Sequence, residues 1–278
     1  AASIAQHFWQ YKNHSLIDFG GGIGFNAAFF KHIGFENIVL VDHDALCIQD
    51  AQKIHAAVEL KVAGYVSGGL DYLKSINLNN TIVASRDVIE HVYNLKEFFQ
   101  ITSSAFVNTH NTAAIHKSFF RKQEFEGIHH KAENLGFNEE GLKAMDSNMA
   151  YSQLRRNFIK SNYPNLQDID AAVLDTRGLN YRDMERFLAQ QHYDELAKQY
   201  LYSNTCNPDT GNWAERTLPF EAYKIFAKEA GVTSLQFELL NYNTFNQGLI
   251  KKMGLKALNK IVQITQNPRF APSFTVTY

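Results

Sequence analysis

Short apolar runs alternate with segments of helical spacing through the first part of the chain. In the segment after the second run, Cys47, Ala51, Ile54 and Val58 follow one another at helical spacing, which places them on one helix face. Strands that alternate with such helices predict right-handed crossovers and a parallel, doubly wound sheet. The predicted strands are 16–19, 37–42, 62–66, 81–84 and 105–109, with helices at about 23–33 and 70–76 and one ending at Phe99.

The pattern changes after the fifth predicted strand. Residues 113–216 show helical segments and loops but no convincing strand. A helix over 220–230, with Gly231 positioned to cap it, then precedes two more strands, 235–240 and 274–278. The fold expected from this order is α/β, with a doubly wound, mostly parallel seven-stranded sheet and a helical insertion after the fifth strand.

This order of elements divides the chain into three parts. Residues 1–112 are expected to form the first part of the α/β core, and 217–278 to complete it. The insertion, 113–216, leaves the sheet at the edge where doubly wound folds bind ligands. We therefore expect the insertion to act as a lid over a substrate.

Composition and charge narrow the functional class. The chain has 278 residues, of which 45% are hydrophobic and 20% charged, and this excludes a disordered protein. Lys plus Arg is 27 and Asp plus Glu is 28, so we expect no nucleic-acid partner held by bulk charge. No apolar run approaches the roughly 18–20 residues of a membrane span. The first residues lack a basic start followed by a long apolar stretch, so we expect no secretory signal and a cytoplasmic protein without a membrane partner. The only cysteines, Cys47 and Cys206, provide neither a disulfide framework nor zinc-ligand spacing, and no metal is expected.

The strongest chemical signal is the sequence DFGGGIG at residues 18–24. Gly20, Gly22 and Gly24 alternate between an apolar strand and a helix, where glycine allows a tight turn and a close ligand approach. Each glycine costs about 0.5–1 kcal/mol of backbone entropy on folding, which disfavours a turn without a ligand. Asp42 ends the second strand, where a carboxylate can accept both hydroxyls of a ribose. Its alternative role is a helix N-cap, for which Asp44 is the better candidate.

Two cofactor classes fit this loop. Residues 22–27 satisfy G-x-G-x-x-A, the fingerprint that places a pyrophosphate at a helix N-terminus in NAD(P)-dependent oxidoreductases. Asp18 argues against that class, because an acid is unfavourable beside a pyrophosphate. An acid suits a cofactor that carries an ammonium group and a sulfonium.

The same residues resemble class I S-adenosylmethionine-dependent methyltransferases. Residues 18–24 resemble the first motif of that family, and Asp42 resembles its ribose-binding acid. The sequence RDVIEHV at 86–92 is similar to the D-V-x-E-H stretch of the branch that includes ubiquinone-pathway O-methyltransferases. Residues 108–111 occupy the position of a short segment after the fifth strand, and 274–278 resemble the antiparallel seventh strand, inserted beside the sixth.

The resemblance implies S-adenosyl-L-methionine as the cofactor and assigns residues to it. The three glycines of the loop would lie under its methionine part, and Asp18 would help to hold its amino group. Asp42 would bind the ribose. The adenine would be bordered by residues 67–70, among them Gly69 and Leu70, with His43 as a further neighbour. The methionine side would be lined by Asp87 and Val88.

Two histidines are candidates for a general base. His91 follows the fourth strand and His110 lies at the end of the fifth, and the ordinary histidine pKa, near 6.5, suits proton removal from an acceptor hydroxyl. The alternative for Glu90 and His91 is a charge pair that faces solvent. By analogy with the resembled branch, the expected reaction is methyl transfer to an oxygen of a small molecule. Two other functions remain open: an NAD(P)-dependent oxidoreductase, and a non-catalytic domain of a larger protein, which the missing initiator Met favours.

The insertion carries two further groups of polar residues. His129 and His130 suggest a metal cluster, but adjacent residues of a helix point about 100° apart, so a polar helix face is the preferred interpretation. Several arginines form either a solvated face or a site for an anionic acceptor, since Arg binds carboxylate or phosphate in a bidentate fork. These are Arg155, Arg156, Arg177, Arg182 and Arg186.

Overall fold

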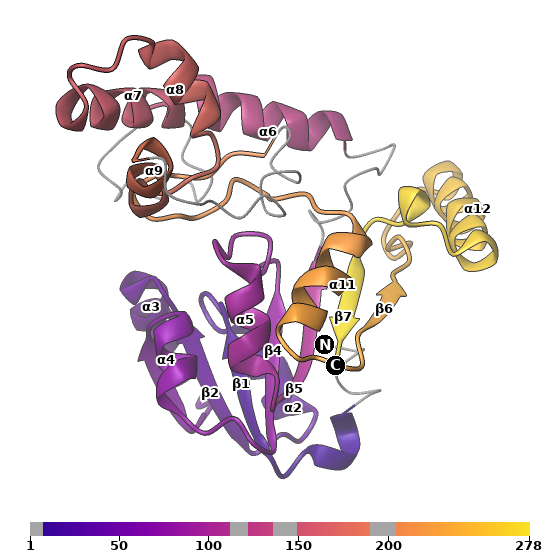
Figure 1. The fold of residues 1–278 in the computed structure, drawn as a ribbon. Helices are drawn as coiled ribbons and strands as arrows, with labels where there is room; N and C mark the ends of the chain where they lie inside the picture. Colours follow the sequence, from indigo (N-terminus) through magenta and orange to yellow (C-terminus); the bar gives the residue numbers. More distant parts are fainter. Residues whose placement is uncertain (1–7, 112–121, 136–148, 190–203) are drawn as a thin grey trace.

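The computed structural model describes residues 8–111, 122–135, 149–189 and 204–278, and its centre is one seven-stranded sheet (Figure 1). The strand order is β3-β2-β1-β4-β5-β7-β6. Strands β1 to β5 are parallel, and β7 runs antiparallel to both of its neighbours. The expected mostly parallel sheet, with a reversed last strand beside the sixth, is therefore confirmed. The strands are β1 Ser15–Phe19, β2 Asn37–Asp42, β3 Gly64–Ser67, β4 Thr81–Arg86, β5 Phe106–Asn111, β6 Gln236–Leu239 and β7 Phe274–Thr277.

Two strands run further than the apolar pattern predicts. β4 continues two residues beyond Ala84 to Arg86, and β5 continues to Asn111. In the parallel register Arg86 lies opposite His110. Polar side chains at the ends of these strands do not interrupt the pairing, because backbone N–H and C=O groups form it. The extension therefore brings two candidate site segments, 86–92 and 108–111, side by side.

Alternating residues of each strand face two different helical layers. Leu16 of β1 packs with helices α2 (Phe25–His32) and α3 (Ala45–Ala57), whereas Ile17 packs with α4 (Leu70–Ser75), α5 (Leu95–Thr102) and α11 (Phe220–Glu229). This follows from the period of two along a strand. Asp18 falls on the same face as Leu16, toward α2. The sheet is thus covered on both faces, and its polar residues gather at one edge.

Local capping explains where two of these helices begin. The left-handed φ of +86° at Gly24 closes the glycine loop, so α2 starts at Phe25 rather than near Ile23. Helix α3 is capped by Asp44, whose Oδ1 accepts the backbone N–H of Leu46 at 2.8 Å. The expectation that Asp44 rather than Asp42 is the N-cap is confirmed.

Helices occupy the described residues between β5 and α11. They are α6 (Lys122–Asn134), α7 (Tyr151–Asn162), α8 (Ile169–Asp175) and α9 (Tyr181–Leu188), and they lie above the sheet in Figure 1. Helices α7, α8 and α9 bury an apolar cluster of their own, which includes Ile159 of α7 and Met184 of α9. In the described ranges of 113–216 the only β-type pairing is an isolated bridge between Cys206 and Trp213. The three-part division of the chain and the role as a lid stay predictions.

A buried ion pair joins three parts of this helical region. The guanidinium of Arg155 in α7 is fully buried and pairs with Glu133 of α6. Thr205 donates its hydroxyl to the Glu133 Oε2 at 2.6 Å. Arg156 and Arg186 form ion pairs with carboxylates of the same region. Three of the five arginines considered for an anionic acceptor therefore have carboxylate partners within the insertion, and Arg155 is structural.

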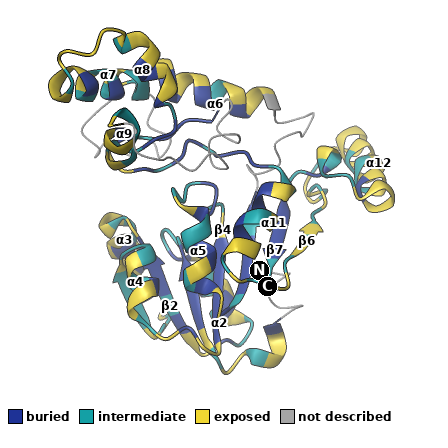
Figure 2. Cartoon of the chain, viewed as in Figure 1, coloured by how far each residue is buried: buried dark blue, intermediate teal, exposed yellow. Residues whose placement is uncertain are grey.

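One long helix, α12 (Leu249–Thr265), was not predicted from the sequence. Val262 anchors it in the main core, and the side chain of Asn259 pairs with the backbone of Tyr242, accepting its N–H at 2.7 Å and donating to its oxygen at 3.0 Å. Most other residues of α12 are exposed (Figure 2). No helix in the described ranges has the length and apolar content needed to cross a membrane.

Candidate functional site

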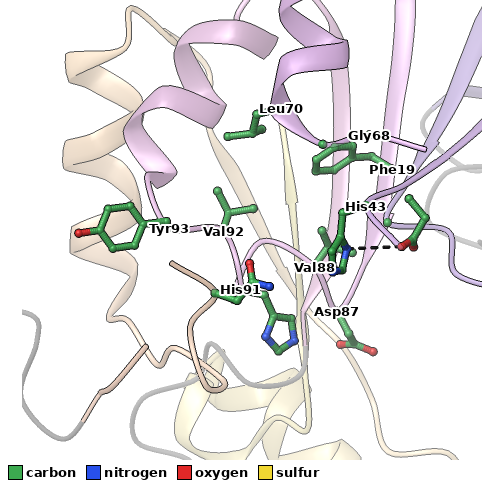
Figure 3. A pocket seen from close by; sticks show the side chains of 13 residues that line it. Phe19, His43, Gly68, Leu70, Asp87, Val88, His91, Val92 and Tyr93 are labelled. Atoms are coloured by element: carbon green, nitrogen blue, oxygen red, sulfur yellow. Dashed lines mark ion pairs between the residues drawn. The ribbon is translucent and has the colours of Figure 1, made fainter. Parts of the chain in front are cut away.

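A cavity of about 390 Å³ opens at the carboxyl ends of β1, β2, β3 and β4 (Figure 3). It is built from the turns after four strands, as the doubly wound topology predicts. Eight of the twelve predicted site residues line it: Gly20, Asp42, His43, Gly69, Leu70, Asp87, Val88 and His91. Seven of the ten positions that the resemblance assigned to the cofactor thus gather around one cavity, although they are far apart in the sequence.

Five further residues line this cavity. Gly68 belongs to the range 67–70 that was expected to border the adenine, and Phe19 directly precedes the first glycine of the loop. Val92 and Tyr93 continue the segment after β4. Asn212 comes from the far end of the helical region, where the sequence contains no recognisable signal. The helical region therefore contributes directly to the wall of the cavity.

Two glycines of the loop are required by their surroundings. Gly20 has a φ of +68°, and a Cβ there would overlap the Val88 side chain, 3.0 Å from Cγ1 and closer to Cγ2. Gly24 has a φ of +86°, and a Cβ there would lie 2.5 Å from the Nε2 of His55. Gly22 also has a positive φ, +54°, but no atom lies within 4 Å of its would-be Cβ. A side chain at Gly20 or Gly24 would therefore overlap its neighbours, whereas the space beside Gly22 is open.

Asp42 holds the glycine loop against the end of β2. Its Oδ2 accepts the backbone N–H of Gly22 at 2.7 Å, and its Oδ1 accepts that of Asp44 at 2.9 Å. The His43 Nδ1 lies 3.4 Å from the same Oδ1. Each carboxylate oxygen has a second lone pair, so Asp42 can still accept the two hydroxyls of a ribose. One side chain can therefore shape the loop and bind a sugar.

Asp18 lies beside a second, smaller cavity rather than in the wall of the first. This cavity has a volume of about 160 Å³ and is also lined by Asn26, Ser85, Asn108 and His110. Asp18 is 1% exposed, and among the described residues neither of its carboxylate oxygens makes a hydrogen bond of good geometry. Burial raises the pKa of Asp18 to about 7, although the Ala27 backbone and the Asn26 side chain lie close enough to lower it in part. A cation placed beside Asp18 would favour its ionised form.

The two cavities meet at a pair of titratable side chains. Asp87 lines the larger cavity and His110 the smaller, and the Asp87 Oδ1 lies 3.8 Å from the His110 Nδ1. Burial lowers the pKa of His110, and the nearby Asp87 carboxylate partly offsets that effect. Asp87 has a φ of +53°, and its backbone N–H donates to the carbonyl of His110 at 2.8 Å. This rare backbone conformation fixes the direction of the Asp87 side chain.

His91 is held by the helical region. Its Nδ1 lies 2.9 Å from the carbonyl oxygen of Trp213, and the Trp213 N–H donates back to the carbonyl of His91 at 3.2 Å. A carbonyl only accepts, so Nδ1 carries the proton and Nε2 is the basic nitrogen. The alternative of a solvent-facing Glu90–His91 pair is wrong, because Glu90 is 1% exposed.

Aromatic contacts strengthen this link between the helical region and the segment after β4. The rings of Tyr93 and Trp213 stack with centroids 6.0 Å apart, and the Trp213 Nε1–H donates to the Tyr93 carbonyl at 3.1 Å. The Tyr93 hydroxyl donates to the Asp183 Oδ2 at 2.6 Å. The segment 204–217 is thereby fastened across one side of the cavity.

The histidine pair of the helical region does not form a metal site. The Nε2 of His129 lies 2.8 Å from the backbone oxygen of Glu215, and burial lowers the pKa of His129. Over the described part of the chain, no group of three or more His, Cys, Asp and Glu side chains is arranged to hold a metal ion. The sequence favoured a polar helix face for both histidines. In the structure His129 is instead buried and has a structural role.

Comparisons with known proteins give only remote similarities. No protein-family model matches the sequence, and no curated protein matches it. Among solved structures, a SAM-dependent methyltransferase from Archaeoglobus fulgidus is 12% identical, with 99% of this chain and 90% of that chain covered and a TM-score of 0.44. PKMT2 from Rickettsia typhi in complex with AdoHcy is 15% identical, with 96% and 48% covered and a TM-score of 0.43.

A putative sarcosine dimethylglycine methyltransferase from Galdieria sulphuraria is also 15% identical, with 40% of this chain and 44% of that chain covered and a TM-score of 0.35. In several such matches, the alignment covers only about half the length of the other protein. Similarities this remote do not define a reaction, and the function is therefore argued from the site itself.

Proposed function

We propose that the chain binds S-adenosyl-L-methionine and transfers its methyl group to a small-molecule acceptor. The observation that supports this most strongly is Asp18, a buried acid without a hydrogen bond of good geometry, placed directly beneath the glycine loop. A Cβ on Gly21 would lie 2.6 Å from the Asp18 Oδ2, so loop and carboxylate are in close contact. A cationic ligand seated on this loop would offset the cost of burying the charge.

The position of Asp18 also separates this proposal from the dinucleotide alternative. The Ala27 backbone and the Asn26 side chain, both in the first turn of α2, lie close enough to Asp18 to lower its pKa. The N-terminus of that helix is where a pyrophosphate binds in dinucleotide-binding folds. A carboxylate already faces it here, and a second anion would be repelled. The arrangement therefore favours a sulfonium cofactor over NAD(P).

The other residues around the cavity fit the remaining parts of this cofactor. Asp42 offers two oxygens to the ribose, and Gly68, Gly69 and Leu70 form a wall without charged groups for the adenine. Asp87 and Val88 would line the methionine side. When bound, the cofactor supplies a methyl carbon that its sulfonium makes electrophilic. The chain then has to orient an acceptor and exclude water, and orientation alone can supply several kcal/mol, up to roughly 7–11, of barrier reduction.

We assign proton removal to His91 and the acceptor atom to oxygen. His91 lines the larger cavity, and its bond to the Trp213 carbonyl makes Nε2 the basic nitrogen. His110 lines the smaller cavity, and burial lowers its pKa below the ordinary histidine value, which makes it less suited to proton removal there. An oxygen acceptor has to lose a proton during transfer, whereas a neutral amine can attack without a base. If the acceptor atom is oxygen, loss of the base should therefore lower the rate of methyl transfer.

Replacing His91 with asparagine should lower the methyl-transfer rate by about 10²–10⁴-fold without changing cofactor affinity. Asparagine keeps a donor for the Trp213 carbonyl but has no basic nitrogen. The assay follows labelled methyl transfer from S-adenosyl-L-methionine to the small-molecule fraction of a cell extract, and His110→Asn is the matched control. Full activity in His91→Asn with loss in His110→Asn would reverse the assignment. Cofactor binding without turnover in the unmodified protein would favour a non-catalytic domain.

Replacing Asp42 with alanine should weaken S-adenosyl-L-methionine binding by about 1–3 kcal/mol, because hydrogen bonds from the ribose to a charged group are lost. Isothermal titration of the full chain with this cofactor and with NAD measures the effect. Asp42→Asn preserves the size of the side chain and separates lost charge from a collapsed loop. Asp44→Asn, which keeps a helix N-cap, is the control and should bind normally. Tight NAD binding with no binding of the methionine cofactor would refute the proposed function.

A further inference from the structure

Helix α12 has an apolar stripe that no described part of the chain covers. Leu255, Leu258 and Val262 form its inner face, with Val262 buried in the main core. At 100° per residue, Ile250, Met253 and Ile264 fall together on a different face. They are 88%, 64% and 71% exposed. Solvent exposure of three long aliphatic side chains on one stripe indicates a binding surface.

A row of lysines borders this stripe. Lys252, Lys256 and Lys260 lie along one flank by the same helical geometry, and Lys251 is nearby in the first turn. All four are exposed, and none has a carboxylate partner within the described ranges. From residue 241 to 278 the chain contains four Lys and one Arg but no Asp or Glu. The stripe is therefore bordered by positive charge alone, with no acid nearby in sequence.

The structure assigns this face of α12 to the surface of an anionic lipid bilayer. A helix with an aliphatic stripe and a flanking row of lysines can lie in the interface, with the aliphatic side chains inserted and the ammonium groups at the level of the anionic headgroups. Long lysine side chains reach past apolar surface to place their charge there. The exposed Phe245, four residues before the helix, adds apolar area at the same end.

Charge argues against two other occupants. In a second copy of the chain, α12 would bring a further set of unpaired lysines and no acid, so self-association through this face gains no counter-charge. A nucleic acid would match the lysines, but its backbone offers nothing apolar to the isoleucines. The inference does not depend on the proposed function, and it concerns the bilayer surface, not a span. It replaces the expectation from sequence that no membrane is a partner, which rested on the lack of a spanning segment.

Co-sedimentation of the full chain with vesicles tests the inference. The protein should bind at low salt to phosphatidylcholine vesicles that contain roughly 30% of the anionic lipid phosphatidylglycerol. It should not bind to vesicles of pure phosphatidylcholine, which carry no net charge. Binding should weaken as salt rises, because the headgroup attraction is screened. The double variant Lys256→Glu and Lys260→Glu should bind at least about 30-fold more weakly, since each lost lysine near such a surface contributes about 1 kcal/mol.

A matched control separates α12 from bulk charge. Lys53 and Lys61 are exposed and lie far from α12 in sequence and in the fold, so reversing both gives the same net charge as the α12 variant. This control should bind like the unmodified protein, and Ile250→Ser with Ile264→Ser should bind weakly although its charge is unchanged. Thermal unfolding should be similar for all variants, because each changed side chain is exposed.

Several outcomes would overturn the inference. These are equal binding to neutral and anionic vesicles, equal loss of binding in the control, or no binding to either vesicle. Lysine-dependent binding to immobilised polyglutamate without vesicle binding would reassign the face to an acidic protein. A dimer in sedimentation velocity that is lost in the double isoleucine variant would reassign it to a second copy.

Discussion

Replacing Asp18 with asparagine is expected to remove the pH dependence of cofactor binding between pH 6 and 7.5. The pKa of Asp18 is about 7, so in the free protein the carboxyl is mostly protonated at pH 6 and mostly ionised at pH 7.5. A cationic ligand binds the ionised form more tightly. Affinity for S-adenosyl-L-methionine should therefore rise by roughly 5–10-fold across this range in the unmodified protein and stay flat in Asp18→Asn. The range ends below the ordinary α-amino pKa of about 7.7–8.0, so the ligand's amino group stays mostly protonated, and its sulfonium charge does not titrate.

The same substitution should change how stability responds to pH in the absence of ligand. The folded pKa of Asp18 is raised from 3.8 to about 7, so folding favours the protonated carboxyl. The stabilisation is fully present below pH 3.8 and is lost as pH rises through about 7. Asp18→Asn cannot ionise, and its free energy of unfolding relative to the unmodified protein should increase from pH 4 to pH 8 by about 4 kcal/mol.

Urea unfolding at roughly pH 4, 5, 6, 7 and 8 measures this difference across the titration. The neighbouring Asn26→Ala is a useful comparison, because it keeps the ionisable carboxyl and should preserve the dependence on pH. A constant stability difference across the series would show that Asp18 is ionised in the folded protein throughout. Pyrophosphate-containing ligands that bind more tightly to Asp18→Asn than S-adenosyl-L-methionine does would point back to the dinucleotide alternative.

Replacing Gly20 with alanine should destabilise the protein by about 2–5 kcal/mol. One part is the left-handed backbone at a φ of +68°, which costs a residue with a Cβ about 1–2 kcal/mol. The other part is overlap with the Val88 side chain, and overpacking of this kind costs about 1–3 kcal/mol. Urea unfolding measures the sum.

Gly22→Ala isolates the backbone part, since its φ is +54° and no atom lies within 4 Å of the new Cβ. It should lose only about 1–2 kcal/mol. In a double-mutant cycle, Val88→Ala should recover the overlap cost of Gly20→Ala but none of its backbone cost. Equal losses in the two alanine variants, with no coupling to Val88, would contradict the steric account of Gly20.

Much of the sheet and of the larger cavity could be predicted because the signals are local. The period of two in Leu16 and Ile17 distinguishes the two faces of β1, and an acid at the end of a β-branched run marks Asp42. Parallel topology then brings successive strand ends to one edge without further information. Asp44 was predictable as a cap because capping depends on a side chain and a backbone group two residues apart.

The parts that escaped prediction depend on long-range packing. Apolar residues surround α12 on more than one face, because Val262 packs inward while Ile250 and Ile264 are exposed, so no single stripe marks the helix. The bond between His91 and Trp213 joins residues 122 positions apart. Asp18 lies beside the smaller cavity because it is on the α2 side of β1. The glycine-rich motif alone does not show on which side of the sheet each cavity lies.

The bond from His91 to the Trp213 carbonyl has a consequence for how the protein would work as an enzyme. A single backbone oxygen of the helical region decides which imidazole nitrogen carries the proton. Withdrawal of that oxygen would return His91 to a mixture of tautomers in contact with water. Methyl transfer would then require the segment 204–217 to be in contact with His91. A protein in which this segment had not yet packed against the cavity could bind the cofactor without transferring its methyl group.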